Sequence, residues 1–230
     1  QEDEFALMNM GAPSPYLKMA FPNHPCEGDD YLDFRNVSRE ETERWQQTML
    51  RFLKTIAVRD DRQIVLKSPT HTGRIRVLLE LFPDAKFVHI VRDPLEMYAS
   101  TMKLWPTLWW YQSLHIAKLD NLEDYVFECF DRMYGAFFEQ EPLIDSSRIC
   151  EVRYERLASD TLNEVRRVYD QLDLGDFEAV RPQMEAYLKG LGKYQPNKHE
   201  YDAEMIERVM SRWGEYADRY GYRRDALGDS

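Results

Sequence analysis

The chain has 230 residues with a formal net charge of −11, and 43% of them are hydrophobic and 13% aromatic. This composition suits a folded protein with one sizeable core, so we predict a single domain over residues 1–230 and exclude a disordered chain. The acidic balance argues against a general nucleic-acid binder, and no apolar run approaches the roughly 20 residues that span a bilayer. The three cysteines are widely spaced, which indicates neither a disulfide framework nor a metal site and favours a reducing compartment such as the cytoplasm.

The first third of the chain offers few regular elements. Residues 1–37 read as irregular because four prolines interrupt them, although residues 16–21 have the composition of a short helix. A helix is predicted over residues 38–58, because a serine followed three residues later by a glutamate forms a capping box at its start. The short apolar run over residues 63–66 predicts a buried strand.

The middle of the chain alternates between helix and strand. An amphipathic helix is predicted over Thr72–Phe82, and the β-branched run Lys86–Val91 predicts a strand. Asp93 and Pro94 then suit the N-cap and first turn of another helix, whose end we expect Pro106 to disturb.

The last hundred residues continue the alternation. The predicted elements are a helix over Leu122–Phe138, a strand over Arg148–Val152, and helices over Glu155–Leu172, Phe177–Leu188 and Glu204–Tyr220. A break at Gly175 and a loop over Gly190–Tyr201 separate the last helices. Strands alternating with helices predict an α/β fold in which helices flank a parallel sheet, with ligands at the carboxyl ends of its strands.

An anion site is indicated after the strand that ends at Val91. Arg92 comes directly after this strand, and Ser100 lies eight positions later, about two turns into the next helix. A guanidinium offers a planar fork to a phosphate, and a helical hydroxyl adds a donor. Residues 62–103 hold seven bases and four acids, a local reversal of the chain's charge that suits an anion. The alternative is that Arg92 pairs with a surface carboxylate.

A catalytic role is indicated for two residues that flank a Ser-Pro turn. Lys67 and His71 follow the predicted strand over residues 63–66. Lysine can stabilise charge on a transferring group, and histidine can take a proton from a hydroxyl near neutral pH. The alternative for His71 is a hydrogen bond to the backbone at a helix start. His89, within a strand, fits a half-buried structural histidine.

Two further features allow both a binding and a packing role. Tyr154 follows the third predicted strand, where its ring could stack on a purine or pack in the core. The loop over Gly190–Tyr201 contains Lys193 and could close over a phosphate or serve as an ordinary connection. A cluster of aromatic residues could line an acceptor cleft or pack internally; it comprises Trp105, Trp109, Trp110 and Tyr111.

Taken together, these segments resemble the nucleotide-dependent sulfotransferases, in particular the broad, mostly bacterial branch of that family. LKSPTH, which starts at Leu66, is similar to its catalytic-loop segment, and VHIVRDPLEMYAS is similar to its 3′-phosphate-binding segment, with the Arg-to-Ser spacing retained. VRYERL resembles its later strand-plus-tyrosine segment, and QEDEFAL at the N-terminus resembles an acidic stretch of the same branch.

The resemblance implies a P-loop-like, three-layer α/β fold that uses 3′-phosphoadenosine 5′-phosphosulfate as co-substrate, without a metal. It implies that Arg92 and Ser100 hold the 3′-phosphate and that Tyr154 lies near the adenine. Lys193, in the loop over Gly190–Tyr201, is predicted as a further cofactor contact. The sulfuryl group would pass to a hydroxyl or amine of a small-molecule or glycan acceptor.

The resemblance also suggests catalytic residues. Lys67 would lie near the transferring sulfuryl group, and His71 is the matched candidate for the general base. Glu2 and Glu4 are the rivals of His71, because an acidic base is used in some relatives. Positioning and charge stabilisation would carry much of the catalysis, by analogy with phosphoryl transfer.

One departure from the family pattern concerns the 5′-phosphosulfate. The family's first strand and its Gly/Ser/Thr-rich loop have no counterpart here, and no G-x-x-x-x-G-K-[ST] motif occurs. Because the chain begins with Gln1 rather than methionine, we predict an N-terminally truncated sulfotransferase that is inactive or weakly active as it stands. The alternatives are a non-catalytic nucleotide-binding or interaction module and a phosphoryl-transferring P-loop enzyme; acceptor and oligomeric state stay open.

Overall fold

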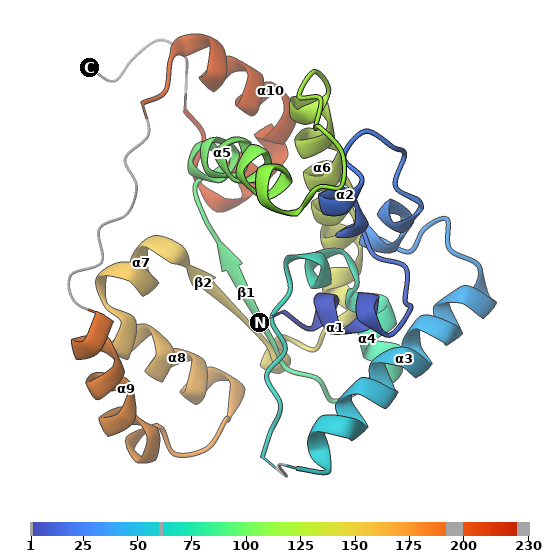
Figure 1. The fold of residues 1–230 in the computed structure, drawn as a ribbon. Helices are drawn as coiled ribbons and strands as arrows, with labels where there is room; N and C mark the ends of the chain where they lie inside the picture. The colour runs from blue at the N-terminus through green and yellow to red at the C-terminus, as the bar shows by residue number, and fades with distance from the viewer. Residues whose placement is uncertain (1, 60–61, 192–199, 225–230) are drawn as a thin grey trace. The chain divides into compact units, whose positions relative to one another are not determined.

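The structure is a computed structural model that describes residues 2–59, 62–191 and 200–224 (Figure 1). The chain divides into two compact units, each built from separate stretches of sequence. The first unit comprises residues 1–83 and 100–143, and the second comprises residues 84–99 and 144–230. That residues 1–230 form a single domain stays a prediction.

The first unit is helical throughout its described regular elements. In chain order these are α1 (Asp3–Asn9), α2 (Leu17–Ala20), the 3-10 helix η1 (Glu27–Leu32), α3 (Arg39–Ala57), the 3-10 helix η2 (Pro69–Gly73), α4 (Ile75–Leu81), the second part of α5 (Pro94–Gln112), α6 (Leu122–Gln140) and η3 (Glu141–Leu143). The predictions of α2, α3 and α6 are confirmed, whereas α1 and η1 formed no part of the expected pattern.

Helix α3 begins as its sequence predicts. The Ser38 side chain accepts a hydrogen bond from the Glu41 backbone N–H, and the Glu41 carboxylate accepts one from the Ser38 N–H. This reciprocal capping satisfies two donors that a helix start otherwise leaves unpaired. The helix buries Trp45 and Met49, and the Trp45 ring packs edge-on against Phe34.

The turn η2 lies close to two other elements of the first unit. It packs against α6 and against η1. A side chain at Gly73 would collide with the backbone carbonyl of Leu32 in η1 and would meet the Met133 backbone in α6 at 3.3 Å. The close approach of three backbones therefore requires glycine at this position.

The second unit contains two paired strands among its described residues. Strands β1 (Phe87–Val91) and β2 (Ile149–Arg153) are parallel, with Phe87 opposite Ile149 and Val91 opposite Arg153. The remaining elements are the start of α5, the 3-10 helix η4 (Ser146–Arg148), α7 (Tyr154–Ser159), α8 (Thr161–Leu172), α9 (Phe177–Leu191) and α10 (Ala203–Tyr220). Both strands and the parallel pairing were predicted.

The second unit has a core between β2 and α8. Cys150 and Val152 of β2 pack with Val168 and Leu172 of α8, all of them buried. Helix α10 buries its own apolar face, where Trp213 lies edge-on to Tyr98 at 6.1 Å between ring centroids.

Two predictions about strands and helix ends are wrong. Residues 63–66 form no strand, and Val65 is 88% exposed, because no strand of the described residues pairs with this segment. Pro106 does not end α5, which continues to Gln112. Proline has no backbone N–H and therefore removes one hydrogen bond of the helix. Trp109, about one turn later, is buried and its indole N–H donates to the Lys18 carbonyl. These contacts hold the helix in place beyond the proline.

Two predicted helices each form as two shorter elements. The segment Thr72–Phe82 is the end of η2 followed by α4, and Glu155–Leu172 is most of α7 followed by α8. In the first case Arg74 has non-helical backbone angles, and in the second Asp160 does. Gly175 has a positive φ of +98°, which explains the predicted break after α8.

Candidate active site

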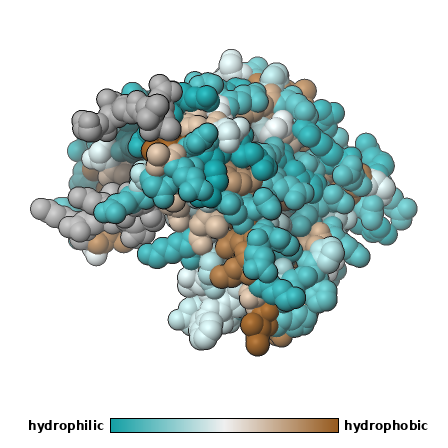
Figure 2. Space-filling model, turned by 90° about the horizontal axis from the view of Figure 1, so that it is seen from above, coloured by the Kyte–Doolittle hydropathy of each residue, from teal (hydrophilic) through white to brown (hydrophobic). Residues whose placement is uncertain are grey.

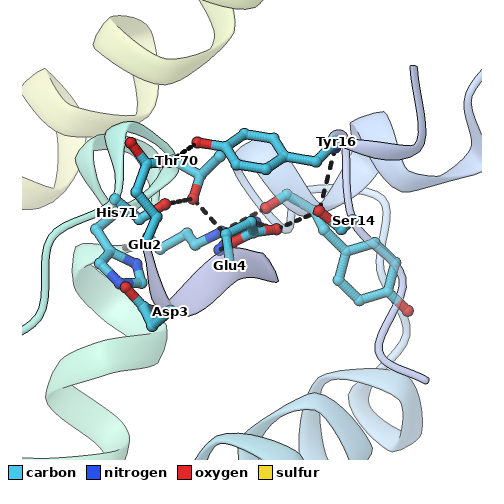
Figure 3. Close-up of polar contacts among 10 residues, drawn as sticks. Glu2, Asp3, Glu4, Ser14, Tyr16, Thr70 and His71 are labelled. Carbon is cyan, nitrogen blue, oxygen red and sulfur yellow. Dashed lines mark hydrogen bonds and ion pairs between the residues drawn. The ribbon is translucent and has the colours of Figure 1, made fainter. Parts of the chain in front are cut away.

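Three consecutive acids at the start of α1 meet three bases on and beside η2 within the first unit (Figure 3). The pairs, in chain order, are Glu2 with Lys67, Asp3 with His71, and Glu4 with Arg74. We call these six residues the acid–base clamp. The bases are spaced by four and three residues, so a turn of helix-like backbone presents them side by side.

Glu4 is the most enclosed member of the clamp. Its side chain and that of Arg74 are fully buried, and the two form a bidentate ion pair with distances of 2.5 and 3.1 Å. The Ser14 and Thr70 hydroxyls donate to the same carboxylate at 2.6 and 3.0 Å. Burial raises the pKa of Glu4, but the Arg74 charge and these hydrogen bonds outweigh it and lower the pKa overall. A saturated, weakly basic carboxylate suits a structural role better than that of a general base.

Glu2 belongs to the most exposed pair of the clamp. One carboxylate oxygen pairs with Lys67, and the other accepts a hydrogen bond from the Tyr16 hydroxyl. The Lys67 side chain is 72% exposed, whereas that of Glu2 is 21% exposed. Burial and the Glu2 carboxylate raise the pKa of Tyr16, so this phenol stays a donor. The clamp thus presents its Lys67 ammonium to solvent.

Asp3 and His71 form the middle pair. The Asp3 Oδ2 atom lies 2.8 Å from His71 Nε2, and the two side chains are 3% and 15% exposed. Burial raises the pKa of Asp3, but the hydrogen bond with His71 and its charge outweigh burial and lower the pKa overall. His71 Nδ1 and Asp3 Oδ1 are buried without a hydrogen-bond partner among the described residues. The predicted base therefore lies against a buried carboxylate.

In the second unit, Arg92 and Tyr154 follow neighbouring strand ends. Because Val91 and Arg153 are in register, the residues after them meet, and the Arg92 guanidinium lies 4.3 Å from the centre of the Tyr154 ring. Arg92 also contacts Glu96 at 3.5 Å, at the limit of a hydrogen bond. Its Nε is buried with no hydrogen-bond partner within the described part of the chain. Among these residues, one donor of this guanidinium is therefore left without an acceptor.

The backbone of Arg92 is held by the last helix. The Tyr216 hydroxyl accepts from the Arg92 N–H at 3.0 Å and donates to the Arg92 carbonyl at 2.9 Å. Tyr216 is 1% exposed. One buried phenol therefore satisfies both backbone groups at the strand end.

The remaining predicted site residues are placed as follows. Ser100 is half-buried in the part of α5 that belongs to the first unit. Lys193 lies outside the described residues. No group of three or more histidine, cysteine, aspartate or glutamate side chains that could hold a metal occurs in residues 2–59, 62–191 and 200–224.

Sequence reasoning did not identify Asp3, Arg74 or Tyr216. The first two carried a signal, because Asp3 lies between two acids already singled out and Arg74 continues the spacing of Lys67 and His71. Tyr216 is 124 residues from Arg92, and nothing local marks it.

The chain is similar to known proteins over most of its length. A family model described as the sulfotransferase family matches residues 10–179. The chain belongs to the sulfotransferase family. Lys67, His71, Arg92 and Ser100 lie within the matched range, whereas the acids of the clamp precede it.

Two curated sulfotransferases resemble the chain over nearly all of its length. The omega-hydroxy-beta-dihydromenaquinone-9 sulfotransferases Stf3 of Mycobacterium bovis and Mycobacterium tuberculosis are each 42% identical over 224 residues. The match covers 97% of this chain and 58% of each relative, so the chain spans little more than half their length.

A solved sulfotransferase shares the fold. The crystal structure of sulfotransferase STF9 from Mycobacterium avium superimposes with a TM-score of 0.72 at 17% identity, over 98% of this chain and 57% of that one. The predicted α/β sulfotransferase fold is confirmed.

Proposed function

We propose that the protein carrying this chain transfers a sulfuryl group from 3′-phosphoadenosine 5′-phosphosulfate to a hydroxyl or amine of a small-molecule acceptor. The observation that carries the proposal is the family match, because it includes the predicted phosphate-binding and catalytic positions Arg92, Ser100, Lys67 and His71. That the chain by itself is weakly active or inactive, and that it is cytoplasmic, stay predictions. None of the helices in its described residues is long and apolar enough to cross a membrane.

The nucleotide end of the proposed donor suits the second unit. Arg92 is about a quarter exposed and has an unpartnered Nε within the described residues, which fits a phosphate oxygen as acceptor. Its stacking on Tyr154 fixes the plane of the guanidinium, and Tyr216 fixes its backbone. A phosphate here would gain a preorganised partner rather than a flexible one.

The first unit supplies the groups for the reaction. In the proposed step, His71 takes the proton of the acceptor hydroxyl as the acceptor oxygen forms a bond to sulfur. The bond between sulfur and the bridging phosphate oxygen breaks, and adenosine 3′,5′-bisphosphate leaves. Lys67 stabilises the negative charge that develops on the transferring group, because its ammonium is held by Glu2 yet stays exposed.

A transfer assay with labelled donor tests the proposal in the complete gene product. We expect His71→Ala to lower the transfer rate by about 100-fold or more and Lys67→Ala by a similar factor, with nucleotide affinity retained in His71→Ala. Arg39→Ala, an exposed change in α3, is the control. If the parent protein binds adenosine 3′,5′-bisphosphate but transfers no sulfuryl group to any hydroxyl, the non-catalytic nucleotide-binding module replaces this proposal.

For the acceptor, we infer a large apolar molecule that carries the reacting hydroxyl. The curated relatives are named for a hydroxylated menaquinone, which is a lipid. Exposed apolar side chains in the first unit agree with such an acceptor, since Trp110, Tyr111 and Ile116 are 79–94% exposed. Figure 2 shows hydrophobic residues at the surface among hydrophilic ones on the face that it presents. The buried Trp109, by contrast, belongs to the packing.

The acceptor class is tested by competition between two hydroxyl compounds. A long isoprenoid alcohol should accept the sulfuryl group well, and a short, water-soluble alcohol or a sugar should accept it poorly. The Trp110→Ala variant should raise KM for the isoprenoid alcohol and leave KM for the donor unchanged. Preference for the sugar would favour the glycan acceptor instead.

A further inference from the structure

The contact between Asp3 and His71 is a buried part of the clamp, and Asp3 has not yet been given a role. Asp3 Oδ2 lies 2.8 Å from His71 Nε2, and the Asp3 side chain is almost fully buried at 3% exposure. Figure 3 shows the imidazole ring facing this carboxylate from the turn η2. The contact joins positions 68 residues apart, so it is not a by-product of local backbone geometry.

The charge of Asp3 determines which partner donates the hydrogen bond in this contact. Its pKa is lowered despite burial, because the hydrogen bond and charge of His71 outweigh desolvation, with a smaller contribution from Arg74. An ionised carboxylate can only accept a hydrogen bond. Neutral His71 must then carry its proton on Nε2, which leaves Nδ1 with the lone pair that a general base needs.

The other charged groups around the pair leave this assignment intact. Arg74 and Glu4 neutralise each other in a bidentate pair, and Lys67 and Glu2 do so on the exposed side. His71 Nδ1 is itself buried and has no hydrogen-bond partner among the described residues, whereas the side chain as a whole keeps 15% of its surface exposed. A buried nitrogen that lacks a partner points to a group that is bound there only in the substrate complex. Hydrogen bonds to a base are often completed only when substrate binds.

We propose that Asp3 is a positioning residue for His71: it holds the Nε2–H tautomer and the ring orientation, so that Nδ1 receives the proton of the acceptor hydroxyl. The inference rests on the proposed function, in which His71 is the base. Asp3 also stabilises the imidazolium formed during the step, since a buried negative charge lies against Nε2 throughout. The proton moves from the acceptor oxygen to Nδ1, and Asp3 stays ionised.

The chain offers a matched control for the carboxylate itself. Asp33 is also 3% exposed and also pairs with a cation, since both of its oxygens accept hydrogen bonds from Arg132 at 2.9 and 3.0 Å. It lies in the same unit and takes no part in the proposed chemistry. Asp3→Asn and Asp33→Asn therefore remove equivalent buried charges, only one of which faces His71.

Steady-state kinetics of the complete gene product test the inference. We expect Asp3→Asn to lower kcat by about 100-fold, within the range that general-base catalysis contributes, and to shift the acidic limb of the pH–rate profile toward lower pH. Asp3→Glu should recover part of kcat. Asp33→Asn should leave the profile in place. If Asp3→Asn loses activity only in proportion to its folded fraction, with an unmoved profile, Asp3 is merely structural and the inference is wrong.

A second measurement needs no variant. Nitrogen-15 NMR of the histidine rings reports the tautomer directly, and the inference requires the Nε2–H form wherever His71 is neutral. A dominant Nδ1–H form would overturn it even if Asp3→Asn fails to fold. The proposed function fails separately, by a His71→Ala variant that keeps full transfer activity.

Discussion

The acid–base clamp and the residues around Arg92, directly after β1, differ in how completely their charged side chains are paired. In the clamp, each of the three bases pairs with an acid at the start of α1, either the N-cap Glu2 or a residue of its first turn, and the innermost pair is fully buried. At the loop after β1, Arg92 has one long contact to Glu96, an aromatic ring beneath it and an unpartnered Nε within the described residues. The clamp pairs its charges internally, whereas the Arg92 guanidinium is held in place with one donor unsatisfied among the described residues, as the proposed phosphate ligand requires.

The largest effect that this comparison predicts is on stability, at the sealed end of the clamp. Arg74→Met leaves the Glu4 carboxylate buried without its partner, so we expect a loss of about 3–5 kcal/mol in the free energy of unfolding, measured with urea. Arg39→Met breaks an exposed pair with Glu43 and should change the free energy of unfolding little, because solvent screens such a pair. Equal losses in the two variants would mean that the buried pair has no special role.

A second prediction is that the two units contribute to the pH dependence of stability in different pH ranges. Burial, followed by the charge of Arg219, lowers the pKa of His89 in β1 from 6.5 to about 4. Its contribution to stability is therefore complete above pH 6.5 and is lost as the pH falls toward 4, because the unfolded state binds the proton first. The full loss is about 3 kcal/mol, since each pKa unit corresponds to about 1.4 kcal/mol.

The carboxylates of the clamp respond at lower pH. Asp3 and Glu4 have pKa values below their ordinary 3.8 and 4.5, so their contribution is present above these values and is lost only below them. Between pH 6.5 and 4.5, the His89→Asn variant should show a flatter stability profile than the parent in urea titrations. Parallel profiles for the two proteins would contradict the assignment to His89.

The smallest predicted effect is at the support of Arg92. Tyr216→Phe removes the hydroxyl that pairs with both backbone groups of Arg92, and we expect a loss of about 1–2 kcal/mol in unfolding free energy. The affinity for adenosine 3′,5′-bisphosphate should fall as well, as the arginine loses its fixed position. Tyr187→Phe in α9, where the side chain is 67% exposed, should change neither quantity. An unchanged affinity in Tyr216→Phe would show that this support is dispensable.

Local signals in the sequence predicted the elements that they encode. The capping box at Ser38 marked the start of α3, and the β-branched run ending at Val91 marked β1. Residues 63–66 carried an equally apolar run but form no strand, because a strand also needs a partner that its own sequence does not specify. The helix α1 lies in a stretch whose prolines and acids pointed to irregular structure.

The candidate site residues were singled out where chemistry and position coincide along the chain. Lys67, His71, Arg92 and Tyr154 were proposed because each follows a predicted strand, and their roles stay predictions. The partners that define how these residues act were mostly not identified: Asp3 is 68 residues from His71, and Tyr216 is 124 residues from Arg92. Such contacts depend on tertiary structure, and one sequence alone does not express them.

Calorimetric titration of the complete gene product with adenosine 3′,5′-bisphosphate tests the division of roles most directly. We expect Arg92→Ala to weaken binding by about 10-fold or more, because it loses hydrogen bonds to a charged group, and His71→Ala to bind like the parent protein. If Arg92→Ala binds as tightly as the parent, Arg92 does not hold the nucleotide and the proposed division of roles is wrong.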